Sequence, residues 1–248
     1  MSQLFPAVRP ASLRRIVAVS AAASAVALTA GAVAPATASA ASSVCGSVAH
    51  CTVVDHADVD GDGHADTVAV VPHKIDKRGN AGSATVRVKT SKGKLLTHTV
   101  KGLQMVPADH LLRASTAIDG EQGAELVITH KNGAHTVWYQ VLTEKRGELR
   151  VSPAPRLPGR AHTVDWLTDG SVTTTGGIYR HKTAGKAPTV TVKTGVRDDD
   201  SSRLKGRSVA FRWQHGGWKK VSSSKHRWTP EQAAKISGWH VKGIDGDL

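Results

Sequence analysis

The residues best suited to metal chemistry form one acidic loop. Aspartates recur at alternate positions, and the loop reads Asp58-Val59-Asp60-Gly61-Asp62-Gly63-His64-Ala65-Asp66. Hard cations such as Ca²⁺ need several oxygen ligands at about 2.4 Å, and alternate residues of a tightly turned loop can supply them. The pattern therefore predicts a calcium site, whose ligands are the carboxylates of Asp58, Asp60, Asp62 and Asp66 and the backbone carbonyl of His64.

A solvated acidic turn is the alternative interpretation of this loop, because Asp-Gly pairs are common in turns. We favour calcium, since every expected oxygen position is filled and carboxylates this close repel one another without a cation. An EF-hand is excluded. Position twelve counted from Asp58 is Ala69, which has no side-chain oxygen. The β-branched run Thr67–Val71 also indicates a strand where an EF-hand has a helix.

An aspartate loop that leads directly into an apolar strand resembles the FG-GAP and VCBS repeat family. The residues that carry the resemblance are Asp60-Gly61-Asp62-Gly63-His64-Ala65-Asp66-Thr67-Val68-Ala69-Val70. The resemblance implies calcium-binding loops between the strands of β-propeller blades in secreted and surface proteins. It covers about residues 52–142. Two units are too few for a complete propeller, which has at least about four blades.

A degenerate copy of the loop lies 59 residues further on, where Asp119 corresponds to Asp60. In this copy Ala117 replaces the first aspartate and Gln122 replaces the glycine at the bend. We therefore expect the second copy to keep the fold of the loop without binding a metal.

The sequence that surrounds the loops predicts an all-β fold. Short β-branched runs are separated by Gly, Asp, Asn and Pro, as is typical of strands and turns. The expected strands are Thr67–Val71, Ala84–Thr90, Leu95–Val100, Glu125–His130, His135–Leu142, Thr189–Thr194, Arg207–Trp213 and Trp218–Ser222. One short C-terminal helix is expected at Pro230–Ile236, where Thr229 and Gln232 can form a capping box. FG-GAP-like strand repeats would build a partial propeller or a small β assembly.

A Pro-rich stretch, residues 152–159, divides the chain into two regions. Residues 41–151 hold the FG-GAP/VCBS-like calcium loop, and residues 160–248 form a C-terminal β-rich region. Proline stiffens the stretch and keeps it out of a central strand. It is either a linker between two domains or a long loop within one.

The first forty residues have the three parts of a secretory signal. Three arginines come first, an apolar run follows (Ile16–Ala34), and an A-x-A site ends at Ala40. An uncleaved membrane anchor is the alternative, but the run consists mostly of weakly hydrophobic Ala, Val, Ser and Gly. We expect a signal peptide, residues 1–40, and a secreted, extracellular protein with no stable membrane span after cleavage.

The two cysteines, Cys45 and Cys51, follow the predicted cleavage site closely. An exported protein meets an oxidising environment, so we expect a disulfide between them. Two free thiols or a metal pair are the alternatives, and the metal pair would need two further ligands.

The chain is strongly basic. Without the three arginines of the first forty residues, the 33 Lys and Arg become 30, against 20 Asp and Glu, which leaves a net charge of +10. Such a charge favours an anionic cell-wall polymer, an acidic glycan or an extracellular protein as partner, and it would allow cell-wall association. Nucleic acid is a less favoured partner. Solvated strand faces are the alternative explanation, because basic and apolar residues alternate along the chain.

No recognisable catalytic motif appears, although folding could still bring together two carboxylates that hydrolyse a glycoside. Three of the six tryptophans, Trp213, Trp218 and Trp228, lie near basic residues and could stack on sugar rings. Core packing is the alternative for each of them.

These observations lead to one functional expectation. The chain should be a secreted, non-enzymatic calcium-binding β-repeat protein that acts as an adhesion or binding module for an anionic wall polymer, glycan or protein. A secreted hydrolase with dispersed carboxylates is one alternative. A purely structural exported domain, in which calcium only holds the fold, is the other.

Export gives the first testable prediction. The protein recovered from the medium of an expressing culture should begin after Ala40, because the A-x-A site is the position that signal peptidase reads. Intact-mass analysis of the exported protein would measure this. A mass that still includes residues 1–40 would contradict the prediction.

Overall fold

The computed structural model describes residues 44–158, 163–171, 173–197 and 202–244. The predicted signal peptide therefore lies outside the described residues. The described residues belong to one compact unit. Strands dominate this unit and pair almost entirely antiparallel, which confirms the all-β prediction. In the described part of the chain, no helix is both long and apolar enough to cross a membrane.

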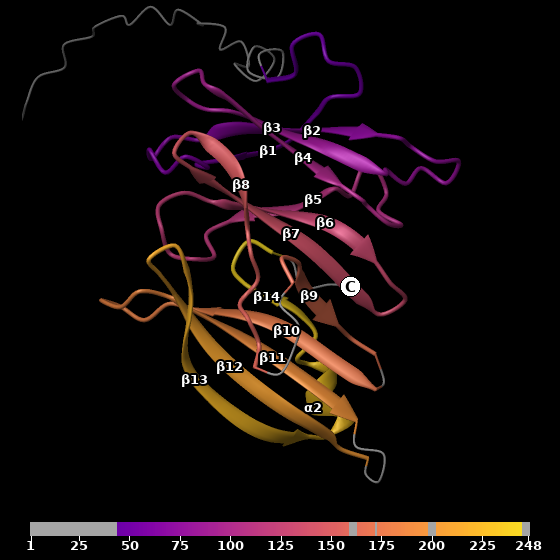
Figure 1. Cartoon of the computed structure of the whole chain (residues 1–248), viewed down its shortest axis with the longest axis vertical. Helices are drawn as coiled ribbons and strands as arrows, with labels where there is room; N and C mark the ends of the chain where they lie inside the picture. Colours follow the sequence, from indigo (N-terminus) through magenta and orange to yellow (C-terminus); the bar gives the residue numbers. More distant parts are fainter. Residues whose placement is uncertain (1–43, 159–162, 172, 198–201, 245–248) are drawn as a thin grey trace, which may run out of the picture. The chain divides into compact units, whose positions relative to one another are not determined.

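The first sheet has four strands, each paired antiparallel with the next along the chain. Figure 1 labels them as β1 (Thr52–Ala57), β2 (Asp66–His73), β3 (Ser83–Lys89) and β4 (Leu95–Lys101).

The second sheet has ten strands among the described residues. They are β5 (Leu112–Thr116), β6 (Glu125–Asn132), β7 (Thr136–Lys145), β8 (Glu148–Ser152), β9 (Trp166–Asp169), β10 (Thr174–His181), β11 (Thr189–Arg197), β12 (Leu204–Gln214), β13 (Gly217–Trp228) and β14 (Gly238–His240). The order is β13-β12-β11-β10-β9-β7-β6-β5, with β8 paired to β7 and β14 paired in parallel to β10.

Strand β7 joins the two parts of this sheet. One edge of β7 pairs with β6. The other edge is shared, since Thr136–Tyr139 pair with β9 and Val141–Lys145 pair with β8. The sheet thus continues across the Pro-rich stretch that follows β8. The division into residues 41–151 and 160–248 stays a prediction.

Strands β5–β8 repeat the arrangement of β1–β4. In both groups each strand pairs with the next strand along the chain, and in both the pairing of the first two strands has an irregular register. The second strand of each group begins with six consecutive buried residues, whereas the first six residues of the third strand alternate half-buried and buried positions. The two acidic loops occupy equivalent places, between the first and second strands of their groups.

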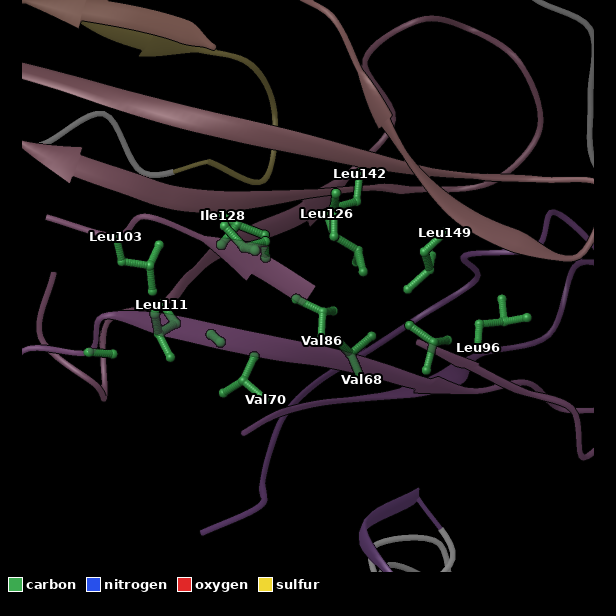
Figure 2. Packing of buried hydrophobic residues seen from close by; sticks show 14 of the residues in the cluster. Val68, Val70, Val86, Leu96, Leu103, Leu111, Leu126, Ile128, Leu142 and Leu149 are labelled. Carbon is green, nitrogen blue, oxygen red and sulfur yellow. The ribbon is translucent and has the colours of Figure 1, made fainter. Parts of the chain in front are cut away.

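Two hydrophobic clusters hold the fold together, and β6 contributes to both. Leu126 and Ile128 belong to the cluster that also contains Val68 and Val86 of the first sheet, as Figure 2 shows. Val127 belongs to the other cluster, with Trp166, Ile178 and other residues of the C-terminal strands. Successive strand side chains point to opposite faces. The middle strands therefore bury both faces, which explains the unbroken apolar run of β6.

The C-terminal helix α2 (Pro230–Ala234) has the predicted capping box and ends two residues earlier than expected. The segment after it packs on β10, where Thr175 Oγ1 donates to the carbonyl of Ala233 at 2.8 Å. A Cβ on Gly177 would lie 1.7 Å from the carbonyl oxygen of Ile236. Glycine is therefore required for this close approach.

Each of the eight expected strands is present in the structure. The sequence did not reveal β1, β5, β8, β9, β10 or β14. The central strand β10 was missed because its Gly176-Gly177 pair is typical of a turn.

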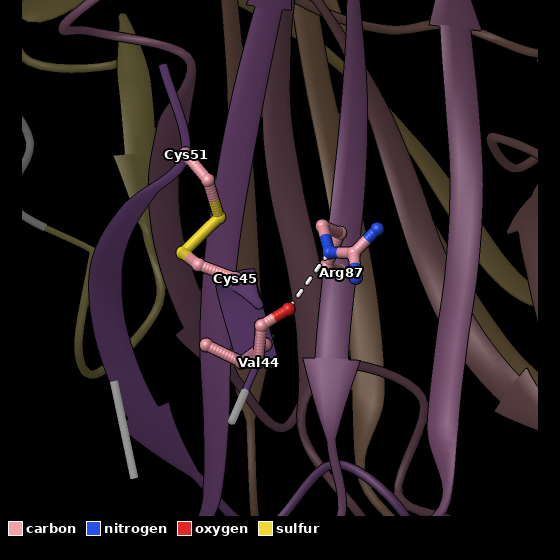
Figure 3. The surroundings of a disulfide bond; sticks show 4 residues. All are labelled: Val44, Cys45, Cys51 and Arg87. Atoms are coloured by element: carbon pink, nitrogen blue, oxygen red, sulfur yellow. Dashed lines mark hydrogen bonds between the residues drawn. A yellow bond between two sulfur atoms is a disulfide. The ribbon is translucent and has the colours of Figure 1, made fainter. Parts of the chain in front are cut away.

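The predicted disulfide between Cys45 and Cys51 is confirmed. The disulfide closes a short loop next to β3. Figure 3 shows the side chain of Arg87, on β3, reaching Val44, the residue that precedes Cys45. Arg87 Nε donates to the carbonyl of Val44 at 2.8 Å. The disulfide and this hydrogen bond attach the start of the described chain to the first sheet.

Reducing the disulfide should lower the free energy of unfolding by about 2 kcal/mol, because so short a loop restricts the unfolded chain only modestly. Urea unfolding with and without a thiol reductant, and of the C45S/C51S variant, would measure the loss. Complete unfolding on reduction would contradict this prediction, and so would no change at all.

Candidate metal centre

The loop between β1 and β2 brings three of the predicted ligands together. One carboxylate oxygen from each of Asp58, Asp60 and Asp66 lies within 4.8 Å of the other two. Asp58 follows the end of β1, and Asp66 is the first residue of β2. The antiparallel pairing of these strands therefore fixes the two ends of the cluster.

Asp66 closes the loop through backbone hydrogen bonds. Its Oδ2 accepts from the N–H groups of Val59 at 2.9 Å and Asp60 at 3.2 Å. Its Oδ1 accepts from the N–H of Ser91 at 2.8 Å. The side chain is buried. Burial of a carboxylate is tolerated here because several donors compensate its lost hydration.

Asp58 and Asp60 are held less completely. Asp58 Oδ2 accepts from the N–H of Gly63 at 2.9 Å, but its buried Oδ1 has no hydrogen-bond partner among the described residues. Burial, followed by the charge of Asp66, raises the pKa of the Asp60 carboxyl. Both observations identify negative charge that the described protein groups do not fully compensate.

Asp62 is directed toward the turn between β3 and β4. Its Oδ2 accepts from Ser91 Oγ at 2.8 Å and lies 3.1 Å from Lys92 Nζ. Its Oδ1 accepts from the N–H of His64 at 2.9 Å. The Ser91 hydroxyl, the His64 N–H and Lys92 lower the pKa of Asp62 to about 2. Ligation by Asp62 and by the carbonyl of His64 stays a prediction.

The cluster fits a hard cation. All its donors are carboxylate oxygens, which suit Ca²⁺ and Mg²⁺ better than softer metals. The buried Asp58 Oδ1 is the kind of atom that a cation satisfies, because an unpartnered buried acceptor costs about 1–3 kcal/mol and more when charged. Asp58, Asp60 and Asp66 can therefore hold a metal ion.

The loop between β5 and β6 has the same backbone arrangement. The N–H of Ile118 donates to Glu125, as Val59 donates to Asp66 in the first loop. Glu121 N–H donates to Asp119 Oδ1 at 2.8 Å, as the corresponding N–H of the first loop does to Asp60. The fold of the loop is therefore retained in the second copy.

The chemistry around the second loop differs, because protein groups cover it. Lys145 pairs with Glu121, and Trp213 Nε1 donates to Glu121 Oε1 at 2.7 Å. Arg180 Nε donates to the carbonyl of Ile118 at 3.2 Å. Two cationic side chains thus lie at the loop whose first aspartate is replaced by Ala117.

Asp119 and Glu125 are both buried, with exposed fractions of 4% and 2%. Burial, followed by the charge of Asp119, raises the pKa of Glu125 to about 8. Burial also raises the pKa of Asp119. Like charges this close cannot both ionise easily, so the pair retains a proton at neutral pH.

The two loops pack directly on each other. The N–H of Ala124 donates to the carbonyl of Asp58 at 2.7 Å. A Cβ on Gly61 would lie 2.8 Å from the Cβ of Gln122, and a Cβ on Gly123 would lie 2.5 Å from the carbonyl oxygen of Val59. Glycine at both positions permits this approach. The second loop therefore packs against the backbone of the loop that carries the carboxylate cluster. The sequence did not predict this role.

The three tryptophans proposed for stacking do not form one platform. Trp213 and Trp218 face each other across the β12–β13 hairpin, with ring centroids 5.1 Å apart. Trp218 also packs edge-on against the buried Trp166. Trp228 lies at the other end of β13, where it stacks on His226. A ligand-binding role for these side chains stays a prediction.

One histidine–carboxylate pair resembles part of a catalytic site. His130 Nδ1 lies 3.1 Å from Asp165, and both side chains are largely buried. His130 Nε2 lies 3.0 Å from the carbonyl oxygen of Lys101. Both ring nitrogens are engaged with protein atoms, so neither is available to a substrate. The pair connects the β4 end to the segment before β9.

Comparisons with known proteins add no relatives: no family model, no curated protein and no solved structure matches this chain.

The buried Glu125 predicts a pH-dependent stability. Burial raises the pKa of Glu125 in the folded protein to about 8, whereas the ordinary pKa of a glutamate is 4.5. The folded state thus binds more protons between these values, so stability should fall as pH rises from about 5 to 8. E125Q should remove that part of the fall.

Urea unfolding of wild type and E125Q, with EGTA present, would measure the difference in slope against pH. E148Q is the matched control, because Glu148 is exposed on β8. An E125Q slope equal to that of wild type and E148Q would show that Glu125 does not carry this dependence.

Proposed function

We propose that this protein is an exported, non-enzymatic, calcium-stabilised β-repeat protein that acts outside the cell as a binding module for an anionic partner. The observation that carries the proposal is the cluster of Asp58, Asp60 and Asp66, with its buried, unpartnered Asp58 Oδ1. Calcium is the favoured ion because it is a hard cation that accepts carboxylates, carbonyls and water in flexible geometry.

The arrangement of strands supports a propeller-like repeat. Two four-stranded groups, β1–β4 and β5–β8, carry an acidic loop in the same place, and β10–β13 is a third antiparallel run of four. FG-GAP and VCBS repeats would have this organisation. On this proposal the described chain is a short stack of such units and not a closed ring.

Calcium would act on the fold through the contact between the loops. The cluster joins the end of β1 to the start of β2, and the carbonyl of Asp58 accepts from the second loop. An ion bound by the first loop would therefore strengthen the attachment of the first strand group to the second. This assigns calcium a structural role, with recognition of the partner elsewhere on the surface.

A binding role is favoured over hydrolysis by two observations. Without the first forty residues the net charge is +10 (30 Lys and Arg against 20 Asp and Glu), which favours long-range attraction of polyanions. The carboxylates that fold together are either turned toward backbone donors, as Asp66 is, or buried, as Glu125 is. An anionic cell-wall polymer or acidic glycan is the partner class that this charge suits best.

Calcium should raise the thermal unfolding midpoint of the wild type. Extracellular calcium modules bind at about 10⁻⁴–10⁻³ M. Millimolar calcium is about 1 to 10 times this dissociation constant and would add about 0.4–1.4 kcal/mol if the unfolded chain does not bind. D60N should remove most of this gain, because it deletes one of the three clustered carboxylates.

D119N is the matched control, since Asp119 is the equivalent residue of the second loop. It should keep the full calcium response even if its baseline stability changes. The measurement is the unfolding midpoint of all three proteins in EGTA and in millimolar calcium. An unchanged wild-type midpoint, or equal losses of response in both variants, would mean that the first loop is only a solvated turn.

A further inference from the structure

Strands β12 and β13 collect basic side chains on one face. Arg207 lies directly opposite Lys225, and Lys205 lies opposite Arg227. Directly opposed residues of an antiparallel pair share a face, and so do residues two apart on one strand. The four cationic side chains therefore form two successive rows on the same face of the sheet.

The basic side chains lie on the same face of β12 as the buried C-terminal cluster, just past the end of that cluster. Val192 of β11 pairs with Val209 of β12, and both belong to the buried C-terminal cluster. Two residues further along, Thr194 pairs with Arg207. The inward-facing positions thus change from apolar to cationic at the point where the core ends.

An open cleft of about 790 Å³ lies over these rows. Leu157 and Pro158 of the Pro-rich stretch line it together with the basic strands, and Val196, which is 48% exposed, is also part of its lining. None of the described residues that line the cleft is Asp, Glu, Phe, Tyr or Trp. The cleft therefore combines a strongly cationic surface with small apolar patches.

The opposite face of the same strands is filled by Trp228. A Cβ on Gly206 would lie 2.2 Å from the Trp228 ring, and a Cβ on Gly195 would lie 3.1 Å from it. Gly206 is thus required for the ring to lie flat on the ladder, and a side chain at Gly195 would press against the same ring. The packed indole supports the strands from behind, so the cationic rows project from a rigid surface.

Like charges that face each other across a strand pair are destabilising. The Arg207–Lys225 pair is an unfavourable choice for the fold alone, but it suits a surface that receives negative charge. Successive rows are about 7 Å apart along the strands. An anionic group of a linear polymer could lie against the row of Arg207 and Lys225.

We propose that this cleft binds a linear polyanion built from sugar or polyol units, with Arg207 and Lys225 as its principal contacts. The planar guanidinium of Arg207 can hold a phosphate or carboxylate through two hydrogen bonds, and Lys225 adds a compact charge. Single-stranded nucleic acid fits less well, because its binding sites stack bases on aromatic side chains. This inference rests on the proposed function and gives it a recognition site.

The test compares two double variants that remove the same charge. R207Q/K225Q changes the cleft, whereas K182Q/K186Q changes two exposed lysines on the hairpin between β10 and β11. Binding of the purified proteins is measured on immobilised poly(glycerol phosphate), polygalacturonate, oligothymidine and neutral dextran, from low salt to about 0.15 M salt. Thermal unfolding of each variant, in the same buffer, verifies that it is folded.

The wild type should bind both polyanions and not dextran. R207Q/K225Q should weaken binding about tenfold or more, and the dependence of log affinity on log salt should become shallower by about 1 to 2, as expected for two lost ionic contacts. K182Q/K186Q should change affinity by less than about twofold at the same salt, since hairpin charges contribute only a screened long-range attraction.

Three outcomes would count against the inference in distinguishable ways. If the wild type binds neither polyanion at low salt, the proposed function itself fails. If both double variants weaken binding equally, binding follows the overall charge, and the cleft is not the site although the proposed function stands. Tighter binding to oligothymidine than to either polymer would replace the proposed ligand with nucleic acid.

Discussion

The constraint on which the structure depends is the burial of both faces of the middle strands. Leu126 and Val127 are adjacent in β6, yet they belong to different hydrophobic clusters. The first residue of such a strand is buried, and the backbone N–H groups of the loop that point toward it need acceptors from the protein. A buried carboxylate performs this task in each repeat: Asp66 at the start of β2 and Glu125 at the start of β6.

The two loops balance the resulting negative charge differently. The first loop gathers Asp58 and Asp60 beside Asp66, which creates a site suited to a cation. In the second loop the retained pair of Asp119 and Glu125 is buried, and burial raises the pKa of both groups. Protonation and nearby basic side chains can do there what an ion would do in the first loop. The same loop backbone thus allows negative charge to be compensated either by a cation or by protonation and basic side chains.

The C-terminal strands gather positive charge, whereas the two loops gather negative charge. The rows that contain Arg207 and Lys225 place cations where the sheet extends past its core, and Trp228 fills the opposite face. The acidic loop and the basic cleft are therefore separate devices. On our proposals, the loop acts on stability, whereas the cleft presents charge to a partner. This separation allows calcium dependence and polymer binding to be tested with different substitutions.

The sequence by itself determined the features that depend on local chemistry: the β-branched strands, the Cys45–Cys51 pairing, the capping box of α2 and the alternation of aspartates. Tertiary structure decided what depends on distant partners. Ser91 and Lys92 hold Asp62 toward the turn between β3 and β4. Pairing with β11 makes a strand of the Gly176-Gly177 segment, and the absence of a Cβ at Gly177 lets Ile236 approach it. The opposition of Arg207 and Lys225 also depends on strand register. Local propensity carries no information about these contacts, because they join residues far apart in the chain.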